Sequence, residues 1–140
     1  MRVQMTKRPG WALLASLVLA GAGGCGEKRS YQDYIPSEDA ARRALEATLT
    51  AWQHGRQSDK VEAGSQTIQV LDSKWKSGQQ LDGYEILSAE PGDGPTWFSV
   101  RLKLKRPSRT QEVRYVVVGK QPALMVFREE DYKQAGGGGM

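Results

Sequence analysis

The sequence predicts an α+β fold in which one N-terminal amphipathic helix packs on a curved, mostly antiparallel sheet of four to five strands. Two patterns carry this prediction. Apolar residues recur at steps of three and four over residues 41–52, and they alternate with polar residues at every second position over residues 96–105. The expected strands follow the helix in a run and do not alternate with further helices, which is typical of the α+β class.

The first 24 residues have the three parts of an export signal. Arg2, Lys7 and Arg8 give a basic start, Trp11 to Ala22 is apolar except for one serine and one glycine, and small residues follow. The apolar run is shorter than the roughly 20 residues that a membrane-spanning helix needs. We therefore expect residues 1–24 to be a signal peptide that is removed on export.

The end of this segment indicates a particular kind of export. Ala22-Gly23-Gly24-Cys25 resembles the lipobox of bacterial lipoproteins, in which the cysteine thiol receives a diacylglycerol and the cysteine becomes the first residue. That family usually has leucine where this chain has Ala22. The resemblance implies a lipid on Cys25 that anchors the protein to a membrane, on its periplasmic or cell-surface side. The alternative is a signal anchor, or a secreted protein with one idle cysteine.

Charge and cysteine content exclude several classes of function. Cys25 is the only cysteine, so its acylation leaves no thiol for a disulfide or for thiolate chemistry. The chain has 20 Lys and Arg against 16 Asp and Glu, and three of the basic residues lie in the expected signal peptide. The remaining 17 basic and 16 acidic residues give a net charge of about +1, which offers no electrostatic case for a nucleic-acid partner.

The helix and its approach come next along the chain. Residues 25–36 are polar and end in proline, which predicts a flexible tether ahead of an α+β domain over residues 37–132. Ser37 is suited to cap the helix, whose apolar face ends at Trp52, and Gly55 is suited to stop it.

Strands are expected over residues 67–72, 84–88, 96–105, 112–118 and 123–128. The apolar stripe of the helix should be buried against the apolar faces of the third and fourth strands. The residues expected in this shared core are Leu45, Leu49, Trp52, Phe98, Val100, Leu102, Leu104, Val113, Tyr115 and Val117. Residues 133–140 have nothing to bury and should form a disordered tail.

A helix followed by an antiparallel meander, with ALEATLTAWQHG early and EVRYVVV late, resembles the cone-shaped family of nuclear-transport-factor-like, SnoaL-like and cystatin-like domains. The resemblance covers residues 37–132. It implies a sheet wrapped around a helix, and the family includes ligand-binding pockets, small isomerases and many domains of unknown role. Fold alone does not choose among these functions.

His54 is the only histidine and is a candidate catalytic group. In some SnoaL-like enzymes a histidine and an aspartate act together as acid and base, and Asp59 and Asp72 are available as partners. However, His54 lies at the expected helix end beside Gly55, where an imidazole complements the helix dipole. We therefore interpret His54 as structural and assign no catalytic residue.

Two charged segments are weighed next. The run Glu129-Glu130-Asp131 is interpreted as a solvated strand end, because three adjacent carboxylates diverge and no His or Cys joins them as a metal ligand. The basic set is Arg101, Lys103, Lys105, Arg106 and Arg109. It could meet an acidic partner or anionic lipid headgroups, or it could be the wet side of a sheet, paired with Glu85 or Glu112. We favour the second interpretation.

The tryptophans give no clear site. Trp52 should be core, Trp75 lies in a polar turn-like segment with little obvious cover, and Trp97 falls on the polar face of its strand. An exposed ring can mark a binding surface, but folding under a loop or helix explains these rings equally well.

The sequence therefore predicts a membrane-anchored lipoprotein whose domain is a non-enzymatic binding or interaction domain at the cell envelope. Its partners would be the membrane, through Cys25, and an envelope protein. No cofactor and no metal are expected. The alternative is a small-pocket SnoaL-like enzyme or small-ligand-binding domain. A sheet whose concave face is filled by Trp52, Val100, Leu102 and Val117 would remove the site that the enzyme needs.

Overall fold

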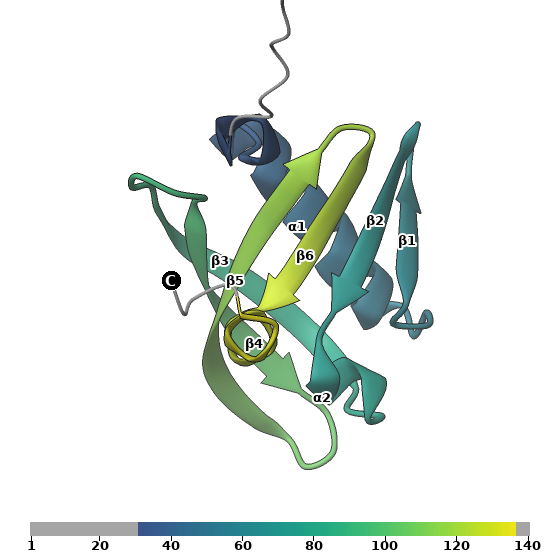
Figure 1. Cartoon of the computed structure of the whole chain (residues 1–140). Coiled ribbons are helices and arrows are strands. Elements are labelled where there is room, and N and C mark those ends of the chain that lie inside the picture. Colours follow the sequence, from purple (N-terminus) through teal and green to yellow (C-terminus); the bar gives the residue numbers. More distant parts are fainter. Residues whose placement is uncertain (1–30, 137–140) are drawn as a thin grey trace, which may run out of the picture.

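The computed structural model describes residues 31–136. The expected signal peptide, Cys25, residues 25–30 of the expected tether and residues 137–140 of the expected tail lie outside the described residues. The described part forms η2 (Tyr31–Tyr34, a 3-10 helix), α1 (Glu38–Gln53), β1 (Lys60–Ala63), β2 (Gln66–Leu71), α2 (Ser73–Lys76), β3 (Leu81–Glu90), β4 (Trp97–Leu104), β5 (Arg109–Lys120), β6 (Ala123–Arg128) and α3 (Glu129–Gln134). Figure 1 shows their arrangement.

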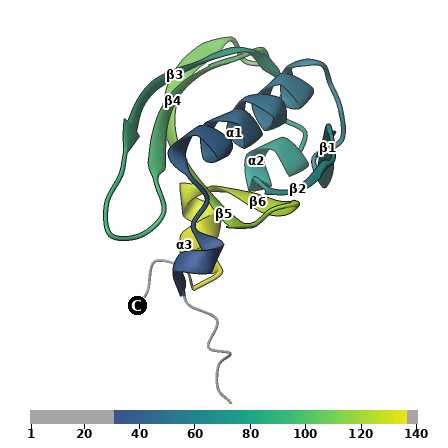
Figure 2. The ribbon, with the colours of Figure 1, turned by 90° about the horizontal axis from the view of Figure 1, so that it is seen from above.

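The six strands form one sheet in the order β1-β2-β6-β5-β4-β3. Every neighbouring pair is antiparallel except β2 and β6, which are parallel. The sheet curls around α1, so that its two edge strands, β1 and β3, lie on either side of the helix (Figure 2). The predicted α+β class is confirmed, with six strands in place of the expected four to five and three α-helices in place of one.

The ends of α1 follow from its sequence. The Ser37 hydroxyl accepts a 3.1 Å hydrogen bond from the N–H of Ala40, and Glu38 and Asp39 lie in the positive first turn. At the other end, Gly55 has a positive φ of 75°, which glycine adopts without steric cost. The predicted start and stop of this helix are both confirmed.

The core lies between α1 and the concave face of the sheet. The stripe on α1 and the inward faces of β4 and β5 belong to one buried cluster, which contains all ten residues predicted for it. The register explains the match, because Val100 lies opposite Val113 and Phe98 lies opposite Tyr115 in antiparallel pairing. The cluster also includes Ile68, Val70, Leu124 and Val126, which β2 and β6 contribute.

Four elements differ from the prediction. The β1 strand was not predicted, because its four residues are too few to show a clear alternation of apolar and polar side chains. Short α2 and α3 have too few residues to show a helical period. Within the expected tether, residues 31–34 form η2, and α3 reaches Gln134, two residues past the expected end of the domain.

The outer face of the sheet is partly covered by α3, on the side opposite α1 (Figure 1). Tyr132 makes edge-to-face contacts with Phe127, at a centroid distance of 5.2 Å, and with Trp97, at 5.5 Å. In the part of the chain from residue 31 to residue 136, no helix has the length and apolar character needed to cross a membrane.

Candidate functional site

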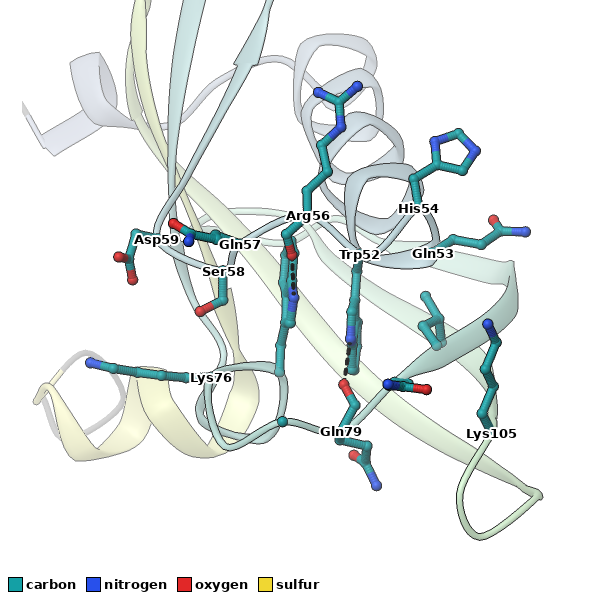
Figure 3. Close-up of a pocket in the computed structure, with 15 residues that line it drawn as sticks. Trp52, Gln53, His54, Arg56, Gln57, Ser58, Asp59, Lys76, Gln79 and Lys105 are labelled. Carbon is teal, nitrogen blue, oxygen red and sulfur yellow. Dashed lines mark hydrogen bonds between the residues drawn. The ribbon is translucent and has the colours of Figure 1, made fainter.

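A pocket of about 700 Å³ opens at the C-terminal end of α1. Three parts of the chain build it: the end of α1 with the loop that follows, α2 with the loop to β3, and the end of β4. The N–H of Lys105 donates a 3.1 Å hydrogen bond to the carbonyl of Gln80, which joins the end of β4 to the loop before β3. Figure 3 shows the side chains that line the pocket.

The helix end fixes the upper wall. The N–H of Gly55 bonds to the carbonyl of Trp52 and the N–H of Arg56 bonds to that of Ala51, at 2.9 and 3.0 Å, which is a Schellman motif. The motif turns the chain at Gly55, whose φ is 75°, and residues 56–59 then line the pocket. The backbone N–H of His54 makes the remaining cap bond, 3.0 Å to Thr50. The imidazole was expected to complement the helix end; the structure places it on the rim of the pocket.

Two stacked indoles form the floor of the pocket. The rings of Trp52 and Trp75 are 5.4 Å apart at an interplanar angle of 15°. The indole N–H of Trp52 donates to the carbonyl of Gln79 at 2.7 Å, and that of Trp75 donates to the carbonyl of Arg56 at 3.1 Å (Figure 3). Trp52 is 2% exposed and Trp75 is 6% exposed. Trp75 is therefore buried against the ring of Trp52. The polar residues around it in the sequence belong to the exposed side of the short helix α2.

The rim of the pocket is basic. Arg56, Lys76 and Lys105 line it, each from a different part of the chain, and all three are exposed. Asp59 is the one carboxylate among the lining residues. Within residues 31–136, none of these four groups has an oppositely charged partner within 4.0 Å. The three side chains lie on different sides of the pocket, and those of Arg56 and Lys76 point away from the Trp52 ring (Figure 3).

The structure divides the predicted basic set in two. Arg101 pairs with Glu85 at 3.0 Å and Lys103 lies 3.8 Å from Asp82, both across the β3–β4 ladder. These two belong to the wet face of the sheet, as expected. The other three members, Lys105, Arg106 and Arg109, lie at or beside the β4–β5 turn and have no such carboxylate within the described residues. That turn adjoins the pocket through Lys105.

The histidine and the two aspartates that were weighed as its partners are not assembled into a catalytic pair. His54 and Asp59 both line the pocket, but they lie on opposite sides of it in Figure 3. Asp72 lies elsewhere and is engaged by other groups. General acid–base catalysis needs each group within hydrogen-bond reach of the proton that it transfers, and within residues 31–136 no hydrogen bond or ion pair joins His54 to a carboxylate.

Asp72 is the centre of a buried polar network that the sequence did not reveal. One carboxylate oxygen accepts from the N–H groups of Lys74, at 3.0 Å, and Trp75, at 3.2 Å, and so caps α2. The other oxygen accepts a 2.6 Å hydrogen bond from the hydroxyl of Tyr115. The Nη1 atom of Arg128 lies 3.3 Å from the first oxygen. The same carboxylate thus joins β2, α2, β5 and β6.

The protonation states in this network are fixed. Burial raises the pKa of Tyr115 well above its usual value, and the negative charge of Asp72 raises it further. For Arg128, burial acts to lower the pKa, but the interactions with Tyr115 and with the carboxylates of Asp72 and Glu130 outweigh it, and the net shift is upward. Around neutral pH the phenol stays neutral and the guanidinium stays charged. Neither group changes its charge there, and both make hydrogen bonds to Asp72 that join β5 and β6 to α2.

The acidic run after β6 has three different partners. Glu129 pairs with Arg114 at 3.0 Å, Glu130 lies 3.3 Å from Nε of Arg128, and Asp131 accepts a 2.8 Å hydrogen bond from the N–H of Ser73. The run was expected to be a solvated strand end; it forms the first turn of α3 and links that helix to the sheet and to α2. Over residues 31–136, no group of three or more His, Cys, Asp or Glu is placed to hold a metal ion.

Trp97 lies on the outer face of β4, as its strand position predicted. The guanidinium carbon of Arg114 lies 4.7 Å from the centre of its ring, and Tyr132 of α3 covers the ring edge. Trp97 is therefore partly covered, and this explains the ring without a ligand.

The concave face of the sheet is filled by side chains. Trp52 is 2% exposed, and Val100, Leu102 and Val117 are fully buried in the same cluster. These four residues pack with α1 in the core that fills the concave side of the sheet. What the site offers chemically is an open, basic, hydrogen-bonding surface at one end of the roll, which suits binding.

No protein-family model, no curated protein and no solved structure matches this chain. The chemistry of the pocket therefore follows from its own residues.

Proposed function

We propose that this chain is a membrane-anchored lipoprotein of the cell envelope whose α+β domain binds a partner and is not an enzyme. The observation that carries the anchor is the position of Cys25. The only cysteine directly follows small residues at the end of a short apolar run with a basic start.

The start of the folded part supports this proposal. Cys25 precedes η2 by six residues, a stretch that spans at most about 22 Å when fully extended. A lipid on Cys25 would hold the domain close to the bilayer surface. A single acyl chain gives only marginal binding, whereas the several chains of a bacterial lipoprotein give stable attachment.

The shape of the domain supports binding. Its core is packed, and the pocket at the end of α1 lies at the surface, where groups from three parts of the chain line it. Side chains that differ in chemistry and are spread over a surface suit recognition of a ligand. The catalytic arrangement considered for His54, a hydrogen-bonded pair with a carboxylate, is absent from the described pocket.

The anchor is tested by labelling producing cells with radioactive palmitate. We expect the label in the wild-type protein and in Gly26→Ser, a control that changes the next residue and leaves the thiol. Cys25→Ser should carry none. Absence of label from the wild-type protein, or its persistence in Cys25→Ser, would show that this cysteine is not the lipid attachment site.

A further inference from the structure

We propose that the C-terminal half of α1 is the docking site for an extended acidic peptide segment of a partner protein. This inference rests on the proposed function, since it names the ligand of the binding domain. The peptide would lie in the seam of the rolled sheet and place its carboxylates at the basic rim of the pocket.

The seam is a second hollow, of about 600 Å³, over the outer side of α1. Its floor is α1, one wall is β1 and the other includes Tyr84 of β3. These strands are the two edges of the sheet, so their outer backbone groups pair with no other strand in the described part of the chain (Figure 2). A free strand edge pairs readily with an extended peptide. Ala47, Ala51 and Ala63 line the hollow and leave space for apolar side chains. The hollow also holds charges of both signs, Arg43, Glu46 and Glu62, so the carboxylates of the ligand belong at the pocket and not along the seam.

The seam and the basic pocket adjoin each other. His54 and Arg56 line both hollows, so a ligand leaving the seam at the end of α1 meets the pocket directly. The two adjoining hollows form one continuous groove, which suits an extended chain better than a single small molecule.

Charge selects an acidic ligand. Arg56, Lys76 and Lys105 line the pocket and have no carboxylate within 4.0 Å in the described chain. Asp59 is the only acidic residue among those that line the pocket. Unpaired cations spread over an opening attract an extended anion and speed its encounter. Because the three cations come from separate parts of the chain, their charges suit several carboxylates along a peptide better than one phosphate group.

The position of the site disfavours a membrane ligand. The chain enters the domain at η2, beside the N-terminal end of α1 (Figure 1). The pocket lies at the other end of this 16-residue helix, about 24 Å away along its axis. In a protein anchored at Cys25 the pocket would therefore lie farther from the anchor than the start of the domain does, which favours a ligand from a separate protein over a headgroup of the same membrane.

The buried indoles disfavour a glycan. Sugar rings are commonly recognised on exposed aromatic faces, but Trp52 and Trp75 stack on each other and are 2% and 6% exposed. Both indole N–H groups are already bonded to carbonyls. The apolar seam and its free strand edges favour a peptide.

The test measures binding of a fluorescein-labelled twelve-residue peptide of alternating Glu and Val to the full chain in detergent micelles, by fluorescence anisotropy at physiological salt. The site variant replaces Arg56, Lys76 and Lys105 by Gln. The control replaces Arg101, Lys103 and Lys120 by Gln, which removes the same charge from exposed positions that line neither hollow. We expect the wild-type protein to bind, the site variant to lose at least about tenfold in affinity, and the control to stay within about twofold.

Three results would overturn the inference. The wild-type protein does not bind the peptide; both triple variants lose affinity equally, which means unspecific charge attraction; or an oligogalacturonate binds more tightly with the same dependence on the three cations, which makes the site a glycan site. Binding to Cys25→Ser should match the wild type. Failure of peptide binding and failure of palmitate labelling are therefore separate outcomes.

Discussion

The hydroxyl of Tyr115 donates a 2.6 Å hydrogen bond to Asp72, a residue 43 positions earlier in the chain. Tyr115 lies on the inward face of β5, and Asp72 lies between β2 and α2. Both are buried, and Arg128 of β6 lies against the same carboxylate. One carboxylate thus holds α2, and with it Trp75 and the floor of the pocket, in place against the sheet.

Replacement of Asp72 should destabilise the domain strongly. Asp72→Ala leaves the charge of Arg128 and the hydroxyl of Tyr115 buried without this partner and removes the cap of α2. Removing one member of a buried ion pair typically lowers the free energy of unfolding by about 3–5 kcal/mol. Asp59→Ala, at an exposed aspartate, should change it by no more than about 0.5 kcal/mol. Urea unfolding of both variants measures this, and a loss below about 1 kcal/mol for Asp72→Ala would contradict the structural role.

The raised pKa of Tyr115 predicts a loss of stability in alkaline solution. Above about pH 10 the phenol ionises in the unfolded chain but stays protonated in the folded domain, so the folded state binds more protons. The free energy of unfolding contributed by Tyr115 is therefore fully present below pH 10. It falls by about 1.4 kcal/mol for each pH unit above that value.

Tyr115→Phe isolates this effect, since the other tyrosines cancel in the comparison. At neutral pH the variant should be less stable by about 1.5–3 kcal/mol, the usual contribution of a hydrogen bond to a charged group. The difference from the wild type should shrink between pH 10 and pH 11. A constant difference over that range would show that the phenol ionises equally well in both states.

The two faces of β4 should respond very differently to truncation. Leu102 and Leu49 are fully buried between sheet and helix, and replacing either by Ala should lower the free energy of unfolding by about 2–5 kcal/mol. Arg101→Ala and Lys103→Ala break exposed ion pairs and should cost no more than about 0.5 kcal/mol. Denaturant titration of the four variants decides the matter, and equal losses for Leu102 and Arg101 would mean that both faces are covered.

The end of α1 should depend on Gly55 and very little on the His54 side chain. Gly55 has a φ of 75°, so Gly55→Ala should cost about 1–2 kcal/mol, although the added methyl group meets no atom within 4 Å. His54 is exposed and its backbone makes the cap bonds, so His54→Ala should cost no more than about 0.5 kcal/mol. Thermal unfolding compares the two. A larger loss of stability for His54→Ala than for Gly55→Ala would show that the imidazole itself stabilises the helix end.

The elements whose buried face the sequence also predicted are those with strong periodicity. The stripe of α1 and the alternation of β4 are long enough to identify both the element and its buried face, and Ser37 and Gly55 identify the helix ends. The β1 strand and the helices α2 and α3 are too short for either period. The parallel pairing of β2 with β6 joins segments far apart in the chain, and no local pattern encodes it.

The sites were harder to predict than the fold. A usable signal for the buried network did exist, because Arg128 continues the inward alternation of Leu124 and Val126 on β6 and so had to be buried. Its partner Asp72 could not be inferred, since the contact forms only when β2 and β6 pair. The pocket likewise combines residues from three separate parts of the chain, and only the folded arrangement brings Lys105 to Arg56 and Lys76.

The central claim, lipidation at Cys25, is tested most directly by intact-mass analysis of the native protein, isolated from the membranes of the organism that produces it. The proposal predicts a chain that begins at Cys25 and is heavier than residues 25–140 by a diacylglycerol, with or without one further acyl chain. Proteolytic fragments should place that mass on the first residue. A full-length chain that still contains an unmodified Cys25 would contradict the proposal.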